Sequence, residues 1–313
     1  MTRRVLVTGS AGLIGRALQR ELVAAGFEVT GLDLRARGHW YGDVRDRERV
    51  ESAVHGCSGV VHLAAVSRVV AGERDPAGCW STNVLGVSEV IDAVERRRDP
   101  PWLIFASSRE VYGQATRLPV CEDATLAPVN VYGRSKLEGE RLVAGLAGRG
   151  GRAAIVRLSN VYGSAADHPD RVIPAFVRAA LAGEPLRVEG AGNTFDFTHL
   201  DDTARGLVAV AKALARGDVL PPLHLLTGRP TTLGELAATV VELAGTTATI
   251  PWREAPARTF DVGRFVGDPS RAASLLGWTA RVALREGLAR LVADCREVHG
   301  APPAHNTGPR GAS

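Results

Sequence analysis

Three side chains of types that can move a proton are spaced so that one fold can bring them together. Tyr132 and Lys136 are four residues apart, so both would project from the same face of a helix. An unperturbed tyrosine has a pKa of about 10, and an ammonium group one turn away, together with a nicotinamide cation, is expected to favour the phenolate by Coulomb attraction. Ser108 follows a predicted strand and can supply a hydroxyl to the same substrate oxygen. The three residues predict a site that removes a proton from an alcohol.

The first fifteen residues predict a site for a pyrophosphate. The apolar run 5–7 fits a buried strand, and apolar residues recur at helical spacing over 13–22. The glycine turn between them places backbone N–H groups and the positive end of a helix at one point, which favours an anion. Gly9 would make the tight turn, Gly12 would let the phosphates approach, and Gly15 would pack helix against strand. The predicted contacts are Gly9, Gly12, Leu13, Ile14 and Gly15.

An acidic residue after the next predicted strand indicates which dinucleotide the site prefers. Asp33 follows the strand expected at 27–32 and stands eighteen residues after Gly15, near the spacing expected of a ribose-binding acid. A carboxylate there accepts from both ribose hydroxyls and repels a 2′-phosphate, so NAD is favoured over NADP. Arg35 and Arg37 follow closely and would soften that preference. With NAD as the hydride acceptor, Ser108, Tyr132 and Lys136 predict oxidation of an alcohol.

Composition excludes several other classes of protein. The 313 residues carry 38 Lys and Arg against 34 Asp and Glu, without a basic block, so a nucleic-acid partner is not expected. No apolar stretch reaches membrane length, and the first strand begins too early for a signal peptide, so a soluble cytoplasmic protein without a membrane partner is expected. The cysteines lack C-x-x-C spacing and the histidines lack metal-ligand spacing, so we expect reduced thiols and no metal site.

Alternating strands and helices predict an α/β fold with a doubly wound parallel sheet, the Rossmann type. The expected strands lie at 5–7, 27–32, 59–65, 102–105 and 153–158. Beyond Ser159 the rhythm changes, with short strands at 186–188 and 195–200 and several helices. We therefore predict a NAD-binding domain of 1–158 plus about 196–228 and a smaller α+β substrate-binding domain of about 159–195 plus 229–300. The Pro/Gly-rich residues 301–313 are expected to be disordered.

A series of motifs extends this pattern over nearly the whole chain. They are Thr8 to Gly15, Asp43-Val44, His62 to Ala65, Asn83 with Gly86, Ser107 to Gly113, Tyr132 to Lys136 and Arg157 to Gly163. In this order they resemble an extended short-chain dehydrogenase/reductase of the NAD-dependent epimerase/dehydratase family, which acts on nucleotide sugars. The resemblance implies an enzyme that binds NAD and a nucleotide sugar.

The resemblance also implies roles for individual residues. Asp43 and Val44 would flank the adenine, and Asn160 would touch the sugar or the diphosphate. The segment beginning at Val172 would border the pocket for the base. The remaining assignments are Leu63, Ala64, Ala65 and Asn83, with Tyr132 and Lys136, to NAD, and Ser67, Ser107, Ser108, Arg109, Phe195 and Arg258 to the substrate. The helices around Asn83 and Tyr132 would form a homodimeric four-helix bundle.

Membership of this family leaves the reaction open. Oxidation at C4 of the sugar allows hydride return to the other face, loss of the 6-hydroxyl, or loss of CO₂ from a uronic acid. Dehydratases of the family usually carry Asp-Glu after the catalytic hydroxyl, where this chain has Arg109-Glu110, which counts against ordinary dehydration. Glu110 is either a catalytic base or a structural carboxylate. A 4-epimerase is the leading hypothesis; a decarboxylase or dehydratase using Glu110, a 4-ketosugar reductase and a non-catalytic dinucleotide sensor are the alternatives.

A second departure from the family concerns the diphosphate. Phe195 stands where the family usually has an arginine that grips the diphosphate, whereas Arg258 matches the family's other diphosphate arginine. Loss of a charge-assisted hydrogen bond would cost about 1.5–3 kcal/mol. Either Arg187, Arg264 or another basic group compensates, or the substrate is not a standard nucleotide diphosphate sugar.

Overall fold

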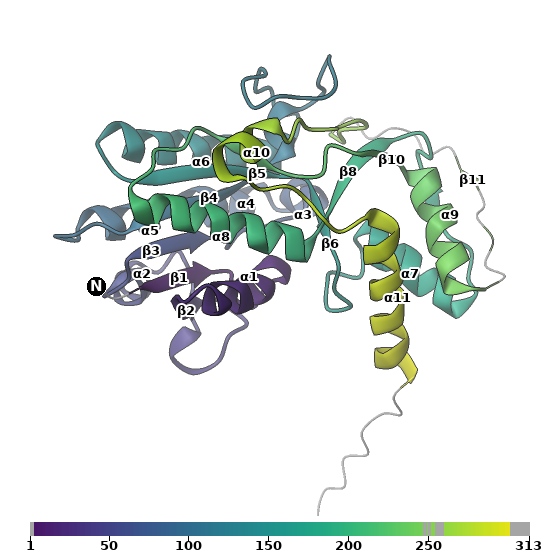
Figure 1. Ribbon diagram of the computed structural model, residues 1–313, viewed down its shortest axis with the longest axis horizontal. Coiled ribbons are helices and arrows are strands. Elements are labelled where there is room, and N and C mark those ends of the chain that lie inside the picture. The colour runs from purple at the N-terminus through teal and green to yellow at the C-terminus, as the bar shows by residue number, and fades with distance from the viewer. Residues whose placement is uncertain (1–2, 247–248, 250–251, 254–259, 301–313) are drawn as a thin grey trace, which may run out of the picture.

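A six-stranded parallel sheet forms the centre of the larger part of the molecule (Figure 1). The computed structural model describes residues 3–246, 249, 252–253 and 260–300. The strands follow the order β2 (Glu28–Leu32), β1 (Arg4–Thr8), β3 (Gly59–His62), β4 (Trp102–Ser108), β5 (Ala153–Leu158) and β9 (Leu223–Leu225). Every neighbouring pair is parallel. The prediction of a doubly wound parallel sheet is confirmed.

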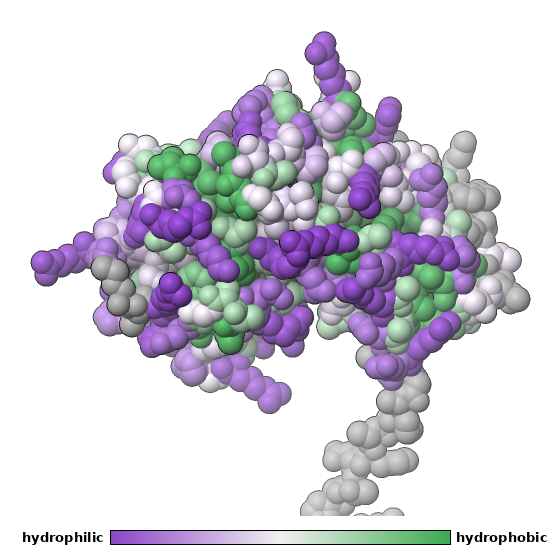
Figure 2. All heavy atoms as spheres, in the orientation of Figure 1, coloured by the Kyte–Doolittle hydropathy of each residue, from purple (hydrophilic) through white to green (hydrophobic). Residues whose placement is uncertain are grey.

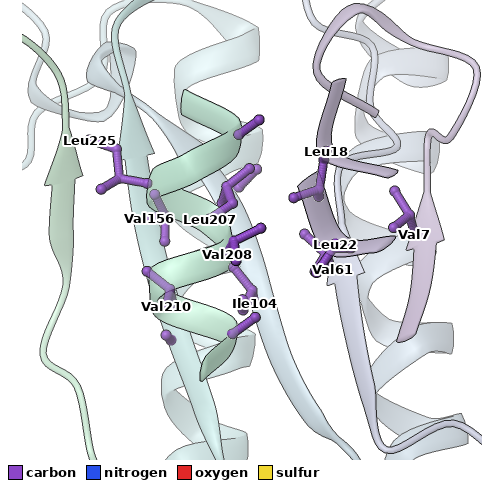
Figure 3. Close-up of a cluster of buried hydrophobic side chains, with 14 of the residues drawn as sticks. Val7, Leu18, Leu22, Val61, Ile104, Val156, Leu207, Val208, Val210 and Leu225 are labelled. Carbon is purple, nitrogen blue, oxygen red and sulfur yellow. The ribbon is translucent and has the colours of Figure 1, made fainter. Parts of the chain in front are cut away.

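Both faces of this sheet are covered because its strands are apolar on both sides. Val5 and Val7 of β1 belong to a core shared with α1 (Leu13–Ala24) and α8 (Leu200–Arg216), part of which Figure 3 shows. Leu6, pointing the other way, belongs to a core shared with α2 (Arg47–Val54), α5 (Gly86–Glu95) and α6 (Val131–Gly148). Because successive side chains of a strand point to opposite faces of the sheet, a strand that is buried on both faces needs an uninterrupted apolar run, as at residues 5–7.

The smaller part of the molecule has its own core, on the right of Figure 1. Strand β8 (Thr194–His199) pairs with β6 (Asn160–Tyr162) and β10 (Pro230–Thr232), and β7 (Val188–Glu189) pairs with β11 (Trp252–Arg253). Helices α7 (Val172–Ala182), α9 (Leu233–Ala244) and α11 (Leu284–Gly300) supply most of this core. The boundaries predicted for two domains stay a prediction, and residues 301–313 lie outside the described residues.

The remaining helices are short. They are η1 (Gly38–Trp40), α3 (Val69–Arg74), α4 (Pro76–Trp80), η3 (Arg109–Tyr112) and α10 (Ser270–Leu276). A helical segment begins at Pro76 with Asp75 as its cap, and a π-helical turn at Ser81–Leu85 separates its first part, α4, from α5. This wide turn presents Asn83 to the interior.

Two helices are capped by the polar side chain of the residue that precedes them. Asp46 accepts a hydrogen bond from Arg49 N at the start of α2. Thr232 and Glu235 form a reciprocal capping box at the start of α9.

Hydrophilic side chains cover much of the face in Figure 2. Among the described residues, none of the helices combines the length and apolarity needed to cross a membrane.

Candidate active site

A cleft of about 1150 Å³ runs from the glycine turn, past the carboxyl ends of the parallel strands, to the smaller part of the molecule. This volume slightly exceeds the usual range of a small-molecule site, about 300–1,000 Å³, and therefore suits more than one ligand. The predicted site residues that line it are Gly9, Gly12, Leu13, Ile14, Gly15, Asp33, Asp43, Val44, Leu63, Ala64, Ala65, Ser67, Ser107, Ser108, Arg109, Glu110, Tyr132, Lys136, Asn160 and Val172.

Two of the predicted site residues that the structure describes are not among those that line the cleft. Asn83 is buried, where it accepts a hydrogen bond from Val66 N at 2.8 Å and donates to Ser135 Oγ at 2.9 Å. It therefore fixes the loop after β3, and a contact with NAD stays a prediction. Phe195 lies against Arg109. Arg258 lies outside the described residues.

The glycine turn has the shape expected of an anion cradle. Gly9 has φ 70°, and a Cβ there would lie 2.8 Å from Ala64 N. A Cβ at Gly15 would lie 2.3 Å from Gly9 O, so glycine is needed for packing as well as for conformation. Helix α1 begins after Gly12 without a side-chain cap and without an acid in its first turn. Its first N–H groups therefore face the cleft and fit a pyrophosphate.

Asp33 is fixed at the end of β2 by two backbone donors. Ala11 N donates to Oδ2 at 2.9 Å, and Arg35 N donates to Oδ1 at 2.7 Å. The carboxylate thus lies beside the glycine turn, where a ribose would follow a pyrophosphate. The guanidinium of Arg35, 3.7 Å from Asp33, also lines the cleft. At Asp43, ion pairing with Arg45 lowers the carboxyl pKa and keeps the group charged.

Tyr132 and Lys136 lie on the first two turns of α6, but their titration differs from the sequence prediction. Burial raises the pKa of the Tyr132 phenol to about 12, against the opposing effect of a hydrogen bond with Ser108. The protein side chains alone therefore do not make the phenol acidic, and the effect of a nicotinamide cation stays a prediction. Desolvation outweighs Coulomb attraction because the phenol is buried.

Lys136 is also deeply buried. Its ammonium donates to Ala106 O at 2.8 Å and lies 4.9 Å from the centroid of the Phe105 ring. Burial lowers the pKa of Lys136 to about 8, so most molecules carry the charge at pH 7. The Lys136 side chain is thus held against the end of β4, the strand that also carries Ser108.

Glu110 is engaged through both of its carboxylate oxygens. Oε1 pairs with Arg109 Nη2 at 3.0 Å, and Oε2 accepts from Asn130 Nδ2 at 2.7 Å. Asn130 in turn accepts from Gly133 N at 2.7 Å and caps α6. Of the two interpretations of Glu110, these contacts favour the structural one.

Arg109 lies against Phe195, the residue that stands where the family usually has an arginine. Its guanidinium carbon lies 4.7 Å from the centroid of the Phe195 ring and 5.8 Å from that of Phe265. Arg187 and Arg264, the candidates named from the sequence, are exposed and do not line the cleft. Compensation by either is therefore not supported.

Several residues of the site gave no signal in the sequence. Arg171 donates to Ser67 Oγ at 3.3 Å and lies 3.6 Å from Asp167, and Arg68 pairs with Asp170. The Arg171–Ser67 and Arg68–Asp170 contacts join the loop after β3 to the segment before α7 across the cleft. Their partners are about a hundred residues apart in the chain, so spacing does not reveal them.

A buried ion pair between Arg157 and Glu140 lies next to the catalytic part of α6. Glu140 lies one turn after Lys136 on α6, and Arg157 binds it through two hydrogen bonds of 2.9 and 2.7 Å. Ser107 also donates to Glu140. The i, i+4 spacing of Lys136 and Glu140 is the signal in the sequence that points to Glu140.

Comparison with known proteins identifies the family. Residues 5–220 match the model of the NAD dependent epimerase/dehydratase family. The chain belongs to this family. A UDP-glucose 4-epimerase from Streptomyces lividans is 29% identical over 332 residues, covering 97% of this chain and 98% of that protein. UDP-glucuronic acid decarboxylase 1 from Arabidopsis thaliana is 30% identical, covering 94% of this chain and 70% of that protein.

A solved structure supports the same assignment. MoeE5, in complex with UDP-glucose and NAD, is 33% identical with a TM-score of 0.85, covering 95% of this chain and 99% of that one. A second MoeE5 structure holds UDP-glucuronic acid and NAD. The predictions of the family, of an NAD-dependent enzyme and of NAD as its cofactor are confirmed. When bound, NAD accepts and returns a hydride at its nicotinamide ring.

Proposed function

We propose that this epimerase/dehydratase family member is a nucleotide-sugar 4-epimerase. Ser108 and Tyr132 would bind the 4-hydroxyl. Tyr132 would take its proton as the phenolate, a form that the charge of Lys136 and of bound NAD would favour against burial, and would later return a proton. Lys136 would orient the phenol and hold positive charge beside it. The nucleotide sugar would lie between these residues and Asn160 and Val172 of the smaller part, in the same cleft.

The observation that carries this proposal is the engagement of Glu110. A base for dehydration must be free to take the C5 proton, whereas the two oxygens of Glu110 are bound by Arg109 and Asn130. Ser108, Tyr132 and Lys136 remain, and they suffice for reversible oxidation at C4. The pattern therefore favours epimerisation over dehydration.

A panel of UDP- and dTDP-hexoses tests this proposal by proton NMR. We expect one of them to be converted to its 4-epimer without net formation of NADH. Tyr132→Phe should lower turnover by about 10²–10⁴-fold without unfolding the protein, whereas Tyr41→Phe, at an exposed tyrosine, should change it little. A 4-keto-6-deoxy product, release of CO₂ or stoichiometric consumption of NADH would contradict the proposal.

We also propose that the enzyme is a cytoplasmic homodimer. Trp80 and Leu85 are each 45% exposed on consecutive turns beside α6, and they border a groove with Pro76, Ala77 and Val131. Large exposed apolar side chains next to one another favour a protein interface. Light scattering should give twice the mass of one chain, and Trp80→Asp should reduce it to one. A wild-type monomer would contradict this.

A further inference from the structure

Arg109 is a buried cation in the cleft whose hydrogen-bonding capacity is only partly used. Its side chain is 12% exposed, and Nη2 pairs with Glu110 Oε1 at 3.0 Å. Its Nη1 is enclosed, and none of the described residues accepts a hydrogen bond from it. Leaving an enclosed donor unpaired costs about 1–3 kcal/mol. The guanidinium therefore has donors available for an acceptor that the protein does not supply.

This guanidinium is held in place before any ligand binds. Phe195 and Phe265 lie 4.7 and 5.8 Å from its carbon, and Glu110, itself held by Asn130, fixes one edge. A stacked, planar guanidinium loses little freedom when it binds a ligand. Its fork geometry matches a planar or tetrahedral oxyanion, a carboxylate or a phosphate.

The position of Arg109 next to Ser108 helps to decide whether its acceptor is a carboxylate on the sugar or a phosphate of the diphosphate. In the proposed function Ser108 and Tyr132 bind the oxygen at C4 of the sugar. In a hexopyranose the diphosphate is on C1, across the ring from C4, whereas C5 and its substituent C6 adjoin C4. Because Arg109 directly follows Ser108 in the chain, its position favours an acceptor at C6 over one on the diphosphate.

Building on the proposed function, we propose that Arg109 binds a carboxylate at C6 and that the substrate is a nucleoside-diphosphate uronic acid. Glu110 and the substrate carboxylate would share the guanidinium, Glu110 through Nη2 and the substrate through the free edge. An ion pair stabilises the carboxylate but not neutral CO₂, so this contact would oppose decarboxylation. Arg109 would act as a specificity residue for a uronic acid 4-epimerase.

Binding to the purified holoenzyme tests the role of Arg109. Calorimetry first determines whether UDP or dTDP binds more tightly, and then compares the glucuronic acid and glucose forms of that nucleotide. We expect wild type to bind the uronic acid at least tenfold more tightly. Arg109→Met should weaken binding of the uronic acid by about 10–150-fold, the equivalent of a charged hydrogen bond, and largely remove the preference. Arg264→Met, an exposed arginine on a segment paired with β8, is the matched control and should leave the preference unchanged.

The outcomes separate this inference from the proposed function. Equal affinity of wild type for the two sugars would overturn the role of Arg109. An Arg109→Met variant that binds both sugars more weakly by the same factor would also overturn it, and would indicate that the guanidinium binds the diphosphate. A uronic acid preference that depends on Arg109, without formation of a 4-epimer, would support the role and contradict the proposed reaction. If Arg109→Met does not fold, Arg109→Lys retains the charge without the fork and should lose part of the preference.

Discussion

Glu110 Oε2 accepts a 2.7 Å hydrogen bond from Asn130 Nδ2, and this contact links the segment after Ser108 to the cap of the helix that carries Tyr132. Asn130 also donates to Phe260 O at 3.1 Å, from a distant part of the chain. The Glu110 carboxylate thus fixes the segment that follows Ser108 relative to α6, the helix that carries Tyr132. Its role in this arrangement is positional.

Replacement of Glu110 by glutamine therefore has a modest predicted effect on turnover. Glutamine retains an oxygen for Asn130 but removes the ionic partner of Arg109. We expect turnover of the 4-epimerisation substrate to fall less than tenfold. The free energy of unfolding should fall by about 1–3 kcal/mol. Complete loss of turnover in a protein with a normal circular dichroism spectrum would show that Glu110 is a base.

Lys136→Met should stabilise the protein at neutral pH while lowering its activity. The Lys136 pKa falls from 10.5 to about 8 on folding, so the charged form is disfavoured in the folded state by about 3 kcal/mol. Loss of the bond to Ala106 O offsets about 1 kcal/mol of the gain. Thermal unfolding of the variant and wild type at pH 7 measures the difference.

The pH dependence of that difference has a definite sign. Below about pH 8 both states of wild type carry the charge, so the penalty is complete. Between about 8 and 10.5 the folded state releases its proton first, and wild type gains stability relative to the variant. Lys212→Met, at the chain's other and exposed lysine, should show no such trend. A constant difference from pH 7 to pH 10 would contradict burial as the cause.

His62 should make the protein sensitive to acid. Burial lowers the pKa of His62 to about 3, while its Nδ1 lies 2.9 Å from Thr8 Oγ1. The unfolded chain takes a proton near pH 6.5 and the folded state does not, so stability is lost as the pH falls from about 6.5 to 3. His62→Leu should remove up to about 5 kcal/mol of this dependence.

Chemical denaturation at pH 7 and pH 4.5 measures this effect. Carboxylates titrate in the same range, so the informative quantity is the difference between variant and wild type. The exposed His55, changed to leucine, is the matched control. An equal loss of stability in wild type and His62→Leu would show that His62 is not the cause.

Features set by neighbours in the chain could be predicted from the sequence. The alternation of Val5, Leu6 and Val7, the turn at Gly9 and the cap at Thr232 depend on residues within a few positions, and the structure agrees with each. The same holds for the placement of Tyr132 and Lys136 four residues apart on one helix that lines the cleft.

Features set by tertiary packing could not be predicted in this way. The pKa of Tyr132 depends on how completely other elements bury the phenol, which the spacing of residues on one helix face does not reveal. Arg109 meets Phe195 only because β8 lies beside η3, and the two residues are far apart in the chain. The contact of Arg171 with Ser67 is of the same kind.

The fate of the hydrogen on C4 tests the central claim most directly. The enzyme is supplied with nucleotide sugar deuterated at C4, in ordinary water, and the product is analysed by NMR and mass spectrometry. We predict that the 4-epimer retains the deuterium at C4 and that no CO₂ or water is lost from the sugar. Loss of the label to solvent, or a product altered at C5 or C6 with an unchanged configuration at C4, would contradict epimerisation by Ser108, Tyr132 and Lys136.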